Sequence, residues 1–492
     1  ENSAVSFDKE LSENNIVTIQ PDSLRILHNP LTGWVLYASM GVDAADFWAQ
    51  YDHIYIPELG HNVSVTDYAH TLYIRASWTD FNPQEDVYGW KIDSNLRAYI
   101  EGAYQRNMRL AFRVVVDSRD KRTEFTPQFV KDAGAKGFMN KGKWSPYSDD
   151  PVFQKYYTKF VKALAKDFND PSKVEFIDGF GLGKWGEYHT MIYSTGDDTP
   201  KKAVFDWVTD IYSQAFDKVP VVINYHRWIG AGKDWVDDEH FAADSEEMLE
   251  EAIKKGYSLR HDAFGMTTYY GSWERRFAEK YRNICPIIME GGWIVKSHNY
   301  WQDPRGYRKD SHEDVRRGEF DDSKEAHVNM MDFRFGDTKS WFKDAFDLVR
   351  RFLREGGYRL YPSEISLPLE VSKKTTPTIK HCWNNLGWGY CPTNIPQWNQ
   401  KYKVAFALLD SETNEVRYTF VDTDTDLSKW IKGSPAEYVF EPDMSKVETS
   451  TYVWAVGLVD RSNKDLVGLD IAAKGDILDS GWLKLSKVSI KK

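Results

Sequence analysis

Two segments of the sequence place a glutamate where an apolar run gives way to glycine and tryptophan. The first segment leads through Gly183 and Trp185 to Glu187, and the second runs from Glu290 to Trp293. Glycines let the backbone turn sharply and bring a bound molecule close to it. A carboxylate beside apolar rings is partly desolvated, which raises its pKa and suits a general acid. Glu187 and Glu290 are therefore the candidate catalytic carboxylates.

A pair of glutamates matches the requirements of glycosidic bond cleavage. That reaction uses two carboxyl groups on opposite sides of the scissile bond, and a separation of ~5–5.5 Å implies a covalent, retaining route. Aromatic residues make up 15% of the chain, and several tryptophans fall in stretches typical of loops. Flat aromatic side chains suit the faces of sugar rings, but large barrels also bury many aromatic residues. Composition alone leaves these two interpretations open.

The elements that would position the glutamates form a repeating pattern. Eight apolar runs of strand type alternate with helical patterns; Glu187 follows the fourth run and Glu290 ends the seventh. Alternation of this kind favours a parallel (β/α)₈ barrel, in which functional side chains project from the C-terminal ends of the strands. The runs are Trp34–Ala38, Leu72–Ser77, Leu110–Val116, Phe176–Leu182, Val219–Asn224, Ser258–Phe264, Pro286–Glu290 and Ala326–Met331.

After residue 357 the pattern changes to short strands separated by turns rich in Asp, Asn, Ser and Gly. Five such strands without helices predict an antiparallel β-sandwich. We therefore expect a catalytic barrel with an N-terminal extension over residues 1–357 and an accessory sandwich over residues 358–492. The expected strands are Tyr402–Leu409, Glu415–Val421, Glu437–Phe440, Tyr452–Val459 and Trp482–Leu485.

The charge and hydropathy of the chain bear on which classes of molecule the protein can bind. The net charge of −11 over 492 residues argues against nucleic acid, whose binders carry a basic face. No apolar run approaches the ~20 residues that a membrane span needs, and residues 1–10 lack a signal-peptide pattern. The spacing of Cys and His matches no metal site, so we expect no metal and no cofactor. Oligomeric state is not predicted.

The three cysteines cannot all pair with one another. Cys382 and Cys391 bracket a plausible loop that a disulfide would staple in an oxidising compartment. Cys285 precedes an apolar run and is expected to be a buried thiol.

With these residues in place, the sequence resembles the clan A glycoside hydrolases, which carry one glutamate after strand four and another after strand seven. The whole chain also resembles bacterial (Bacteroides-type) barrel proteins with a C-terminal sandwich of unknown function. That likeness is carried by Asn29-Pro30, Gly33-Trp34, the 183–187 turn and residues 383–387.

The resemblance implies a role for each glutamate and a location for the protein. Glu187 would be the acid/base and Glu290 the nucleophile of a retaining enzyme that degrades a polysaccharide or oligosaccharide outside the cytoplasm. One position departs from the pattern. Many clan members carry an asparagine before the first glutamate, where it holds the sugar 2-hydroxyl, and Gly186 occupies that position here.

Further substrate-binding residues are expected at the ends of the other strands. An arginine near the nucleophile, such as Arg75, Arg113 or Arg260, would keep it ionised, and a tyrosine near it would donate a hydrogen bond. The stretch 293–325 after the seventh strand is long enough to shape subsites. The expected set is Arg75, Trp78, Arg113, Trp185, His189, Asn224, Tyr225, His226, Trp228, Tyr269, Trp293 and Trp301.

Two other functions compete with glycoside hydrolysis. A non-catalytic glycan-binding protein would keep the aromatic cleft without turnover, and Gly186 favours it. A polysaccharide lyase would use the arginines at the strand ends to bind the carboxylates of acidic sugars.

Overall fold

The computed structural model describes residues 14–233, 236–296, 302–334 and 338–492, which form two compact units. One unit spans Gly33–Leu353. The other combines Glu1–Thr32 with Arg354–Lys492. The N-terminal residues were predicted to extend the barrel, but strand β1 (Asn14–Thr18) pairs with β14 (Leu360–Pro368) of the second unit.

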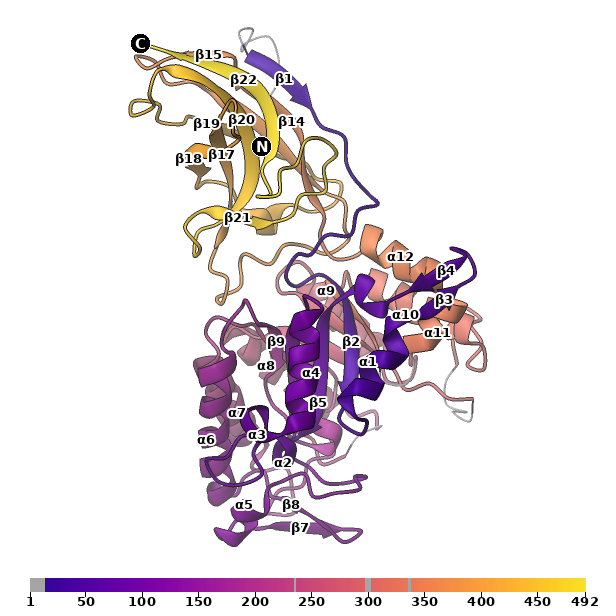
Figure 1. Ribbon diagram of the computed structural model, residues 1–492. Coiled ribbons are helices and arrows are strands. Elements are labelled where there is room, and N and C mark those ends of the chain that lie inside the picture. The colour runs from indigo at the N-terminus through magenta and orange to yellow at the C-terminus, as the bar shows by residue number, and fades with distance from the viewer. Residues whose placement is uncertain (1–13, 234–235, 297–301, 335–337) are drawn as a thin grey trace. The chain divides into compact units, whose positions relative to one another are not determined.

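The first unit is a closed barrel of eight parallel strands, as predicted (Figure 1). Each of the eight apolar runs contains or overlaps one strand. The fourth strand ends at Asp178, earlier than expected, so Glu187 lies in the following loop. The strands in order are β2 (Gly33–Ser39), β5 (Ala69–Ser77), β6 (Arg109–Val115), β9 (Val174–Asp178), β10 (Val221–Asn224), β11 (Ser258–Phe264), β12 (Ile287–Gly291) and β13 (Met330–Phe333).

Helices follow the barrel strands, and their start signals are the expected ones. Asp93 accepts a hydrogen bond from Leu96 N at the start of α4, and Asp150 caps α6 ahead of Pro151. The helices are α1 (Ala44–Asp52), α2 (Trp78–Phe81), α3 (Gly89–Ile92), α4 (Ser94–Gln105), α5 (Gln128–Asp132), α6 (Pro151–Phe168), α7 (Lys201–Ala215), α8 (Glu239–Lys254), α9 (Ser272–Tyr281), α10 (His312–Glu325), α11 (Thr338–Asp344) and α12 (Phe346–Glu355). Two hairpins, β3 (Ile54–Ile56) with β4 (His61–Val63) and β7 (Gly137–Asn140) with β8 (Lys143–Pro146), complete the unit.

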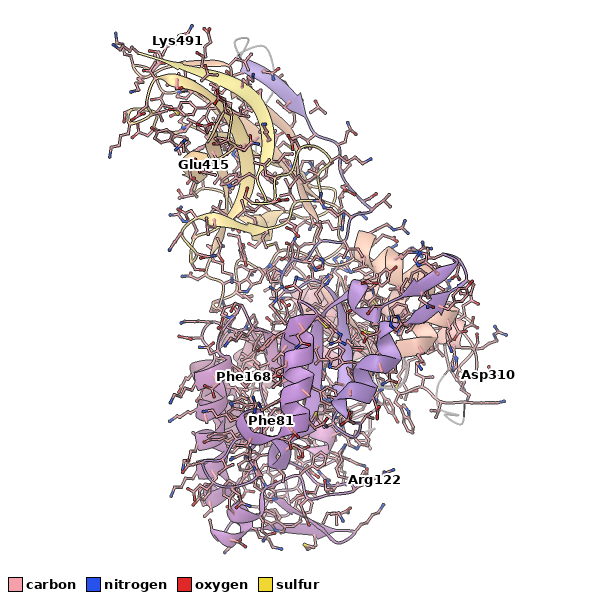
Figure 2. All side chains as sticks on the ribbon, viewed as in Figure 1. Phe81, Arg122, Phe168, Asp310, Glu415 and Lys491 are labelled. Atoms are coloured by element: carbon pink, nitrogen blue, oxygen red, sulfur yellow. The ribbon has the colours of Figure 1, made fainter. Side chains whose placement is uncertain are left out.

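Many aromatic residues fill the layer between the barrel and its helices. Phe81 and Phe168, labelled in Figure 2, both pack edge-on against Phe112 of β6, at ring distances of 5.6 and 4.9 Å. Trp90 contacts the same two rings. Part of the aromatic richness of the chain therefore belongs to the core.

The second unit is a sandwich of two sheets, and most of its strand pairs are antiparallel. One sheet has the order β1-β14-β16-β19, and the other has the order β15-β22-β20-β17-β18 with β21 beside β20. The structure contains strands that the sequence analysis did not predict, namely β1, β14, β15, β16 and β21. The remaining bounds are β15 (Glu370–Ser372), β16 (Ile379–Asn385), β17 (Tyr402–Asp410), β18 (Val416–Asp422), β19 (Ala436–Phe440), β20 (Ser450–Asp460), β21 (Leu466–Leu469) and β22 (Leu483–Lys491).

The three cysteines are buried free thiols, so Cys382 and Cys391 form no disulfide here. Within the described ranges, no helix has the length and apolarity that crossing a bilayer requires. Nor do the described side chains contain a cluster of three or more His, Cys, Asp or Glu suited to a metal ion.

Candidate active site

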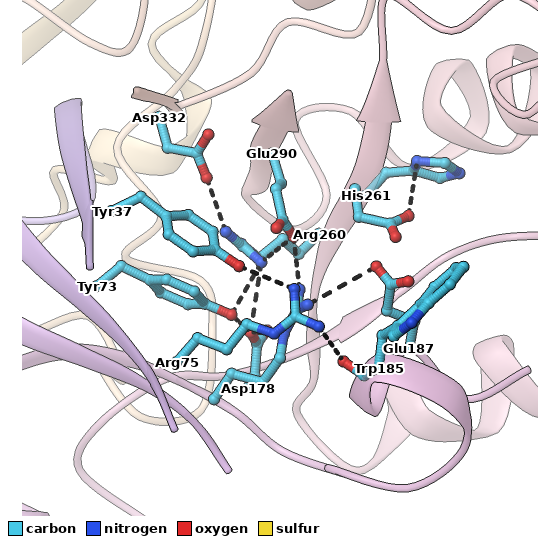
Figure 3. A network of polar contacts seen from close by, with 12 residues as sticks. Tyr37, Tyr73, Arg75, Asp178, Trp185, Glu187, Arg260, His261, Glu290 and Asp332 are labelled. Atoms are coloured by element: carbon cyan, nitrogen blue, oxygen red, sulfur yellow. Dashed lines mark hydrogen bonds and ion pairs between the residues drawn. The ribbon is translucent and has the colours of Figure 1, made fainter. Parts of the chain in front are cut away.

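A layer of charged side chains fills the barrel near the C-terminal ends of its strands (Figure 3). Strand register explains why they meet. Arg75 of β5 pairs with Arg113 of β6, and Asn224 of β10 pairs with Arg260 of β11. Neighbouring residues in register point to the same side of a sheet, which here is the barrel interior.

Glu290 lies at the centre of this layer and is fully buried. Its Oε2 accepts hydrogen bonds from Arg113 Nη2 at 2.5 Å and from Arg260 Nη1 at 2.6 Å. Burial would raise the pKa of Glu290, but the charges of Arg113 and Arg260 outweigh it and lower the pKa to about 2. Glu290 is therefore ionised at neutral pH, as a carboxylate nucleophile must be.

Arg113 connects the two candidate glutamates. Its Nη1 lies 3.7 Å from Glu187 Oε2, while its Nη2 binds Glu290. Its Nε donates to Asp178 Oδ2 at 3.1 Å, and Tyr73 donates to the same oxygen. One fully buried guanidinium thus holds carboxylates from three barrel segments.

Arg260 extends the network to the last barrel strand. Its Nη2 donates to Asp332 Oδ2 at 2.8 Å. Burial raises the pKa of Asp332 to about 7, with the charge of Glu290 adding to the effect of burial and that of Arg260 opposing it. Glu290 and Asp332, which both contact Arg260, thus have pKa values on opposite sides of the ordinary carboxyl range. Of these two residues, only Glu290 is fully ionised at neutral pH.

Glu187 lies in a loop after β9 whose backbone is unusually contorted. Positive φ angles occur at Trp185 (60°), Gly186 (71°), Tyr188 (62°) and Thr190 (52°). Such conformations cost energy in residues other than glycine and cluster at functional sites. The main-chain oxygen of Glu187 accepts a hydrogen bond from His226 Nε2 at 2.7 Å, which anchors the loop to the end of β10.

The protonation of Glu187 differs from the sequence-based expectation of a raised pKa. Burial does raise it, but the hydrogen bond and charge of His189 and the charges of Arg113 and Arg75 lower it further. The pKa of Glu187 therefore lies below its ordinary value. Apolar neighbours alone suggested the opposite, because the strand-end arginines and His189 were not placed beside the carboxylate.

Gly186 has little space around it for the side chain of the asparagine that the resemblance implies at this position. A Cβ on this residue would lie 3.2 Å from Val115 Cγ2 and 3.4 Å from Arg113 Cδ, at a φ of +71°. The absence of a side chain therefore follows from the close approach of the loop to β6.

We expect Gly186→Ala to lower the free energy of unfolding by ~2–4 kcal/mol, combining the cost of a left-handed alanine with crowding against Arg113. Gly142→Ala is the matched control, since Gly142 has a φ of +79° and no heavy atom within 4 Å of an added Cβ. That control should lose only ~1–2 kcal/mol in urea unfolding. Equal losses would show that Val115 and Arg113 yield without cost.

Asn224 carries an unusual buried amide. The residue is fully buried at the end of β10, and neither Oδ1 nor Nδ2 has a hydrogen-bond partner among the described residues. A buried amide without partners costs ~1–3 kcal/mol. Beside Arg260 in register, this donor and acceptor pair is suited to a hydroxyl group of a ligand.

We expect Asn224→Leu to keep or raise the stability of the protein, by up to ~1 kcal/mol, because it removes unpaired polar atoms. Asn82→Leu is the comparison: Asn82 is equally buried, but it accepts from Trp78 Nε1 and donates to two main-chain oxygens. Its replacement should cost ~2–3 kcal/mol in the same denaturation experiment. A similar loss for Asn224→Leu would mean that its amide is satisfied in the free protein.

Several of the predicted substrate-binding residues do gather around the two glutamates. Arg75 donates to Tyr37 Oη at 3.2 Å and to the Trp185 main-chain oxygen at 3.1 Å, next to Glu187. Trp185 packs edge-on against His189 at 5.6 Å. The residues that the structure brings together are Arg75, Arg113, Trp185, His189, Asn224 and His226.

Other predicted residues lie elsewhere. Trp78 is fully buried among Phe153, Tyr157 and other rings of the helical layer, so it is a core residue. Tyr225 points away from the interior and shares a hydrogen bond with Tyr270, so neither donates to Glu290. Trp78 begins helix α2 directly after β5, and Tyr225 directly follows Asn224 at the end of β10, where successive side chains alternate between the two faces.

The predicted substrate-binding residues in loops differ in their exposure to solvent. Trp228 is buried, with its indole donating to the Val236 main-chain oxygen, while Trp293 is 58% exposed three residues after Glu290. Tyr269 is half-buried, and its main-chain oxygen lies 3.5 Å from Arg227 Nη1. Trp301 lies outside the described residues.

Four polar residues of the barrel interior were not predicted from the sequence: Tyr37, Tyr73, Asp178 and Asp332. Tyr73 and Asp178 bind each other and share Arg260, whose Nη1 lies 3.1 Å from Tyr73 Oη and 3.4 Å from Asp178 Oδ2. A signal was present, because Asp178 ends the buried strand β9 and Asp332 interrupts the otherwise apolar strand β13. An acid in a strand covered on both faces needs a buried partner.

Comparison with known protein families finds no matching model, and comparison with curated proteins finds no match either. Solved structures do match. The endo-β-1,4-mannanase from Thermotoga petrophila is 13% identical, with a TM-score of 0.40, over 94% of this chain and 98% of that one. The GH30 endoxylanase from Clostridium papyrosolvens C71 is 8% identical, with a TM-score of 0.39, over 87% and 97%. Endo-glycoceramidase II from Rhodococcus sp. is 11% identical, with a TM-score of 0.39, over 87% and 99%.

Proposed function

We propose that this chain is a retaining glycoside hydrolase acting on a polysaccharide or oligosaccharide, with Glu290 as nucleophile and Glu187 as acid/base. The observation that carries the proposal is the contact of one guanidinium, that of Arg113, with both glutamates inside a (β/α)₈ barrel. It places two carboxylates of different environment next to one another at the end of the barrel where catalytic groups occur.

The environments of the two glutamates suit different tasks. Glu290 is fully buried and receives two short hydrogen bonds from arginines, which keep it ionised for attack on the anomeric carbon. Glu187 lies in a loop, is slightly exposed and contacts an imidazole, which is a source of protons. The retaining route is part of the proposal because a nucleophile and a separate acid/base are the two carboxylate roles that this route requires.

The proposal is tested by product analysis after incubation with plant, algal and host glycans. We expect one glycan class to yield shorter products whose new reducing ends first appear with the anomeric configuration of the substrate. A 2-deoxy-2-fluoro glycoside of the accepted sugar should then label Glu290, as peptide mass spectrometry would detect. Products of inverted configuration would overturn the retaining route. A polymeric substrate also implies a location outside the cytoplasm, which cell fractionation would check.

One observation favours the competing function of glycan binding without turnover. The lowered pKa of Glu187 leaves it ionised at neutral pH, whereas leaving-group protonation needs a proton there. A glycan that binds in calorimetry and remains intact over long incubation would establish this alternative. The unsaturated, ultraviolet-absorbing product of a lyase would point instead to elimination.

A further inference from the structure

The imidazole of His189 is in hydrogen-bond contact with the carboxylate of Glu187. Its Nε2 is 3.4 Å from Glu187 Oε1, and its Nδ1 is 2.8 Å from the hydroxyl of Thr190. Both side chains are almost completely buried. An imidazole in this position exchanges a proton directly with the carboxylate, because one hydrogen bond joins the two groups.

The loop backbone is shaped to bring these two side chains together. The positive φ of Tyr188, between them, turns the chain so that Glu187 and His189 face the same space. The Tyr188 side chain is buried on the other side, edge-on to Phe180 and Phe205. Tyr188 thus fixes the geometry of the pair through packing against apolar rings.

Relying on the proposed hydrolase function, we propose that Glu187 and His189 form one proton-sharing dyad that acts as the acid/base, with His189 storing the proton that Glu187 delivers. This role explains how a carboxylate surrounded by arginines still has a proton available. It goes beyond substrate binding, the role first expected of His189.

The groups that face His189 fit this role. The carboxylate of Glu187 brings a negative charge into hydrogen-bond contact with the ring. The ring of His226 lies 5.5 Å away, but burial and the charge of His189 lower the pKa of His226 to about 3, so it stays neutral. The positive charges of Arg113 and Arg75 oppose protonation of the Glu187 carboxylate. Arg119 donates a hydrogen bond to the main-chain oxygen of Thr190.

In each catalytic cycle the dyad gives up one proton and takes one back. At rest the dyad holds one proton, mainly on His189 as an imidazolium beside the Glu187 carboxylate. During glycosylation this proton passes to Glu187 and on to the glycosidic oxygen as its bond to the anomeric carbon breaks, while a Glu290 oxygen bonds to that carbon. In the second half, Glu187 takes a proton from the attacking water and returns it to His189, and the bond to Glu290 breaks.

The dyad is tested first without any substrate. In ¹⁵N-histidine NMR of the full chain, the His189 signal is assigned by its loss in His189→Gln. We expect the pKa of His189 in the wild type to exceed the ordinary value of ~6.5 and to fall by ~1 or more in Glu187→Gln, because the carboxylate stabilises the imidazolium. His226→Gln, which changes the contacts to the Glu187 main-chain oxygen and to Trp228 N but keeps the Glu187 carboxylate, should leave this dependence intact. An unchanged pKa in Glu187→Gln would overturn the dyad.

A kinetic arm tests its role in hydrolysis, using phenyl and 2,4-dinitrophenyl glycosides of a panel of sugars. His189→Gln should lower kcat/KM for the phenyl glycoside by ~10²-fold, move the basic limb of its pH profile to lower pH, and spare the dinitrophenyl glycoside, whose leaving group needs no proton. Equal losses on both substrates, as expected for His226→Gln, would reduce His189 to a structural role. If the wild type cleaves no glycan or glycoside, the hydrolase proposal fails, while the NMR result still decides whether the proton is shared.

Discussion

Replacing Glu290 by glutamine is expected to lower hydrolysis of an accepted glycan by ~10³-fold or more, because no covalent intermediate can form. Glycan binding should persist, since the side chain keeps its size. The change also removes the negative charge that faces Arg113 and Arg260. Initial rates and calorimetric binding, measured on the same preparations, separate the two effects.

The stability of Glu290→Gln should depend on pH in a defined direction. The pKa of Glu290 is lowered from 4.5 to about 2, so its charge contributes about 3 kcal/mol, fully present above pH ~4.5 and lost as the pH falls toward 2. The stability gap between wild type and variant should therefore shrink over that range in urea unfolding. A gap that stays constant from pH 6 to pH 2.5 would contradict the lowered pKa.

Asp332→Asn provides the matched control for activity. Asp332 contacts the same arginine as Glu290, at 2.8 Å, but its burial-raised pKa of about 7 makes the amide a close mimic of its protonated form. We expect this variant to retain hydrolysis within about tenfold of wild type. A loss as deep as that of Glu290→Gln would mean that the arginine network as a whole, and not Glu290 itself, limits the rate.

Removing the guanidinium of Arg113 is expected to have the largest effect on folding. Arg113→Met keeps much of the buried volume but leaves Arg260 as the remaining cation that contacts both Asp178 and Glu290, so excess negative charge stays buried. Breaking a buried ion pair from one side costs ~3–5 kcal/mol, because an uncompensated charge remains buried. Urea or thermal unfolding at pH 7 would measure this loss.

An exposed arginine, Arg97, provides the control for the buried Arg113. Arg97 pairs with Glu101 at 3.6 Å, four residues away on α4, with both side chains more than half exposed. Arg97→Met should change stability by less than ~0.5 kcal/mol, since solvent screens such pairs. If Arg113→Met were equally mild, Arg260 alone would be enough to compensate the charges of Asp178 and Glu290.

The barrel could be predicted from the sequence because its strands are covered on both faces. Several strands are therefore apolar runs with few interruptions, such as Leu110–Val116, and need no knowledge of their neighbours to be recognised. The sandwich was harder. Strand β14 contains Pro362, which argues against an inner strand, yet the structure places this proline at a register shift opposite β16.

The site was predictable only in part, for a related reason. The ends of strands four and seven were identified from Gly, Trp and Glu in sequence, but the residues that set their charge come from other strands. Arg113 and Asp332 reach Glu290 or its partner Arg260 only after the barrel closes. Closure depends on register between segments distant in sequence, which local patterns do not encode. The direction of the Glu187 pKa was missed for that reason.

The pairing of β1 with β14 has a consequence for how the chain is made. Asn14 lies opposite Pro368, so the edge strand of a sheet in the second unit leaves the ribosome long before its partner exists. The barrel, an insertion between them, has time to form during synthesis, because domains fold as units in order of their emergence. Completing the sheet then closes a very long loop, a slow step that favours late assembly. A fragment beginning at residue 358 would expose the unpaired edge of β14, and we expect it to self-associate.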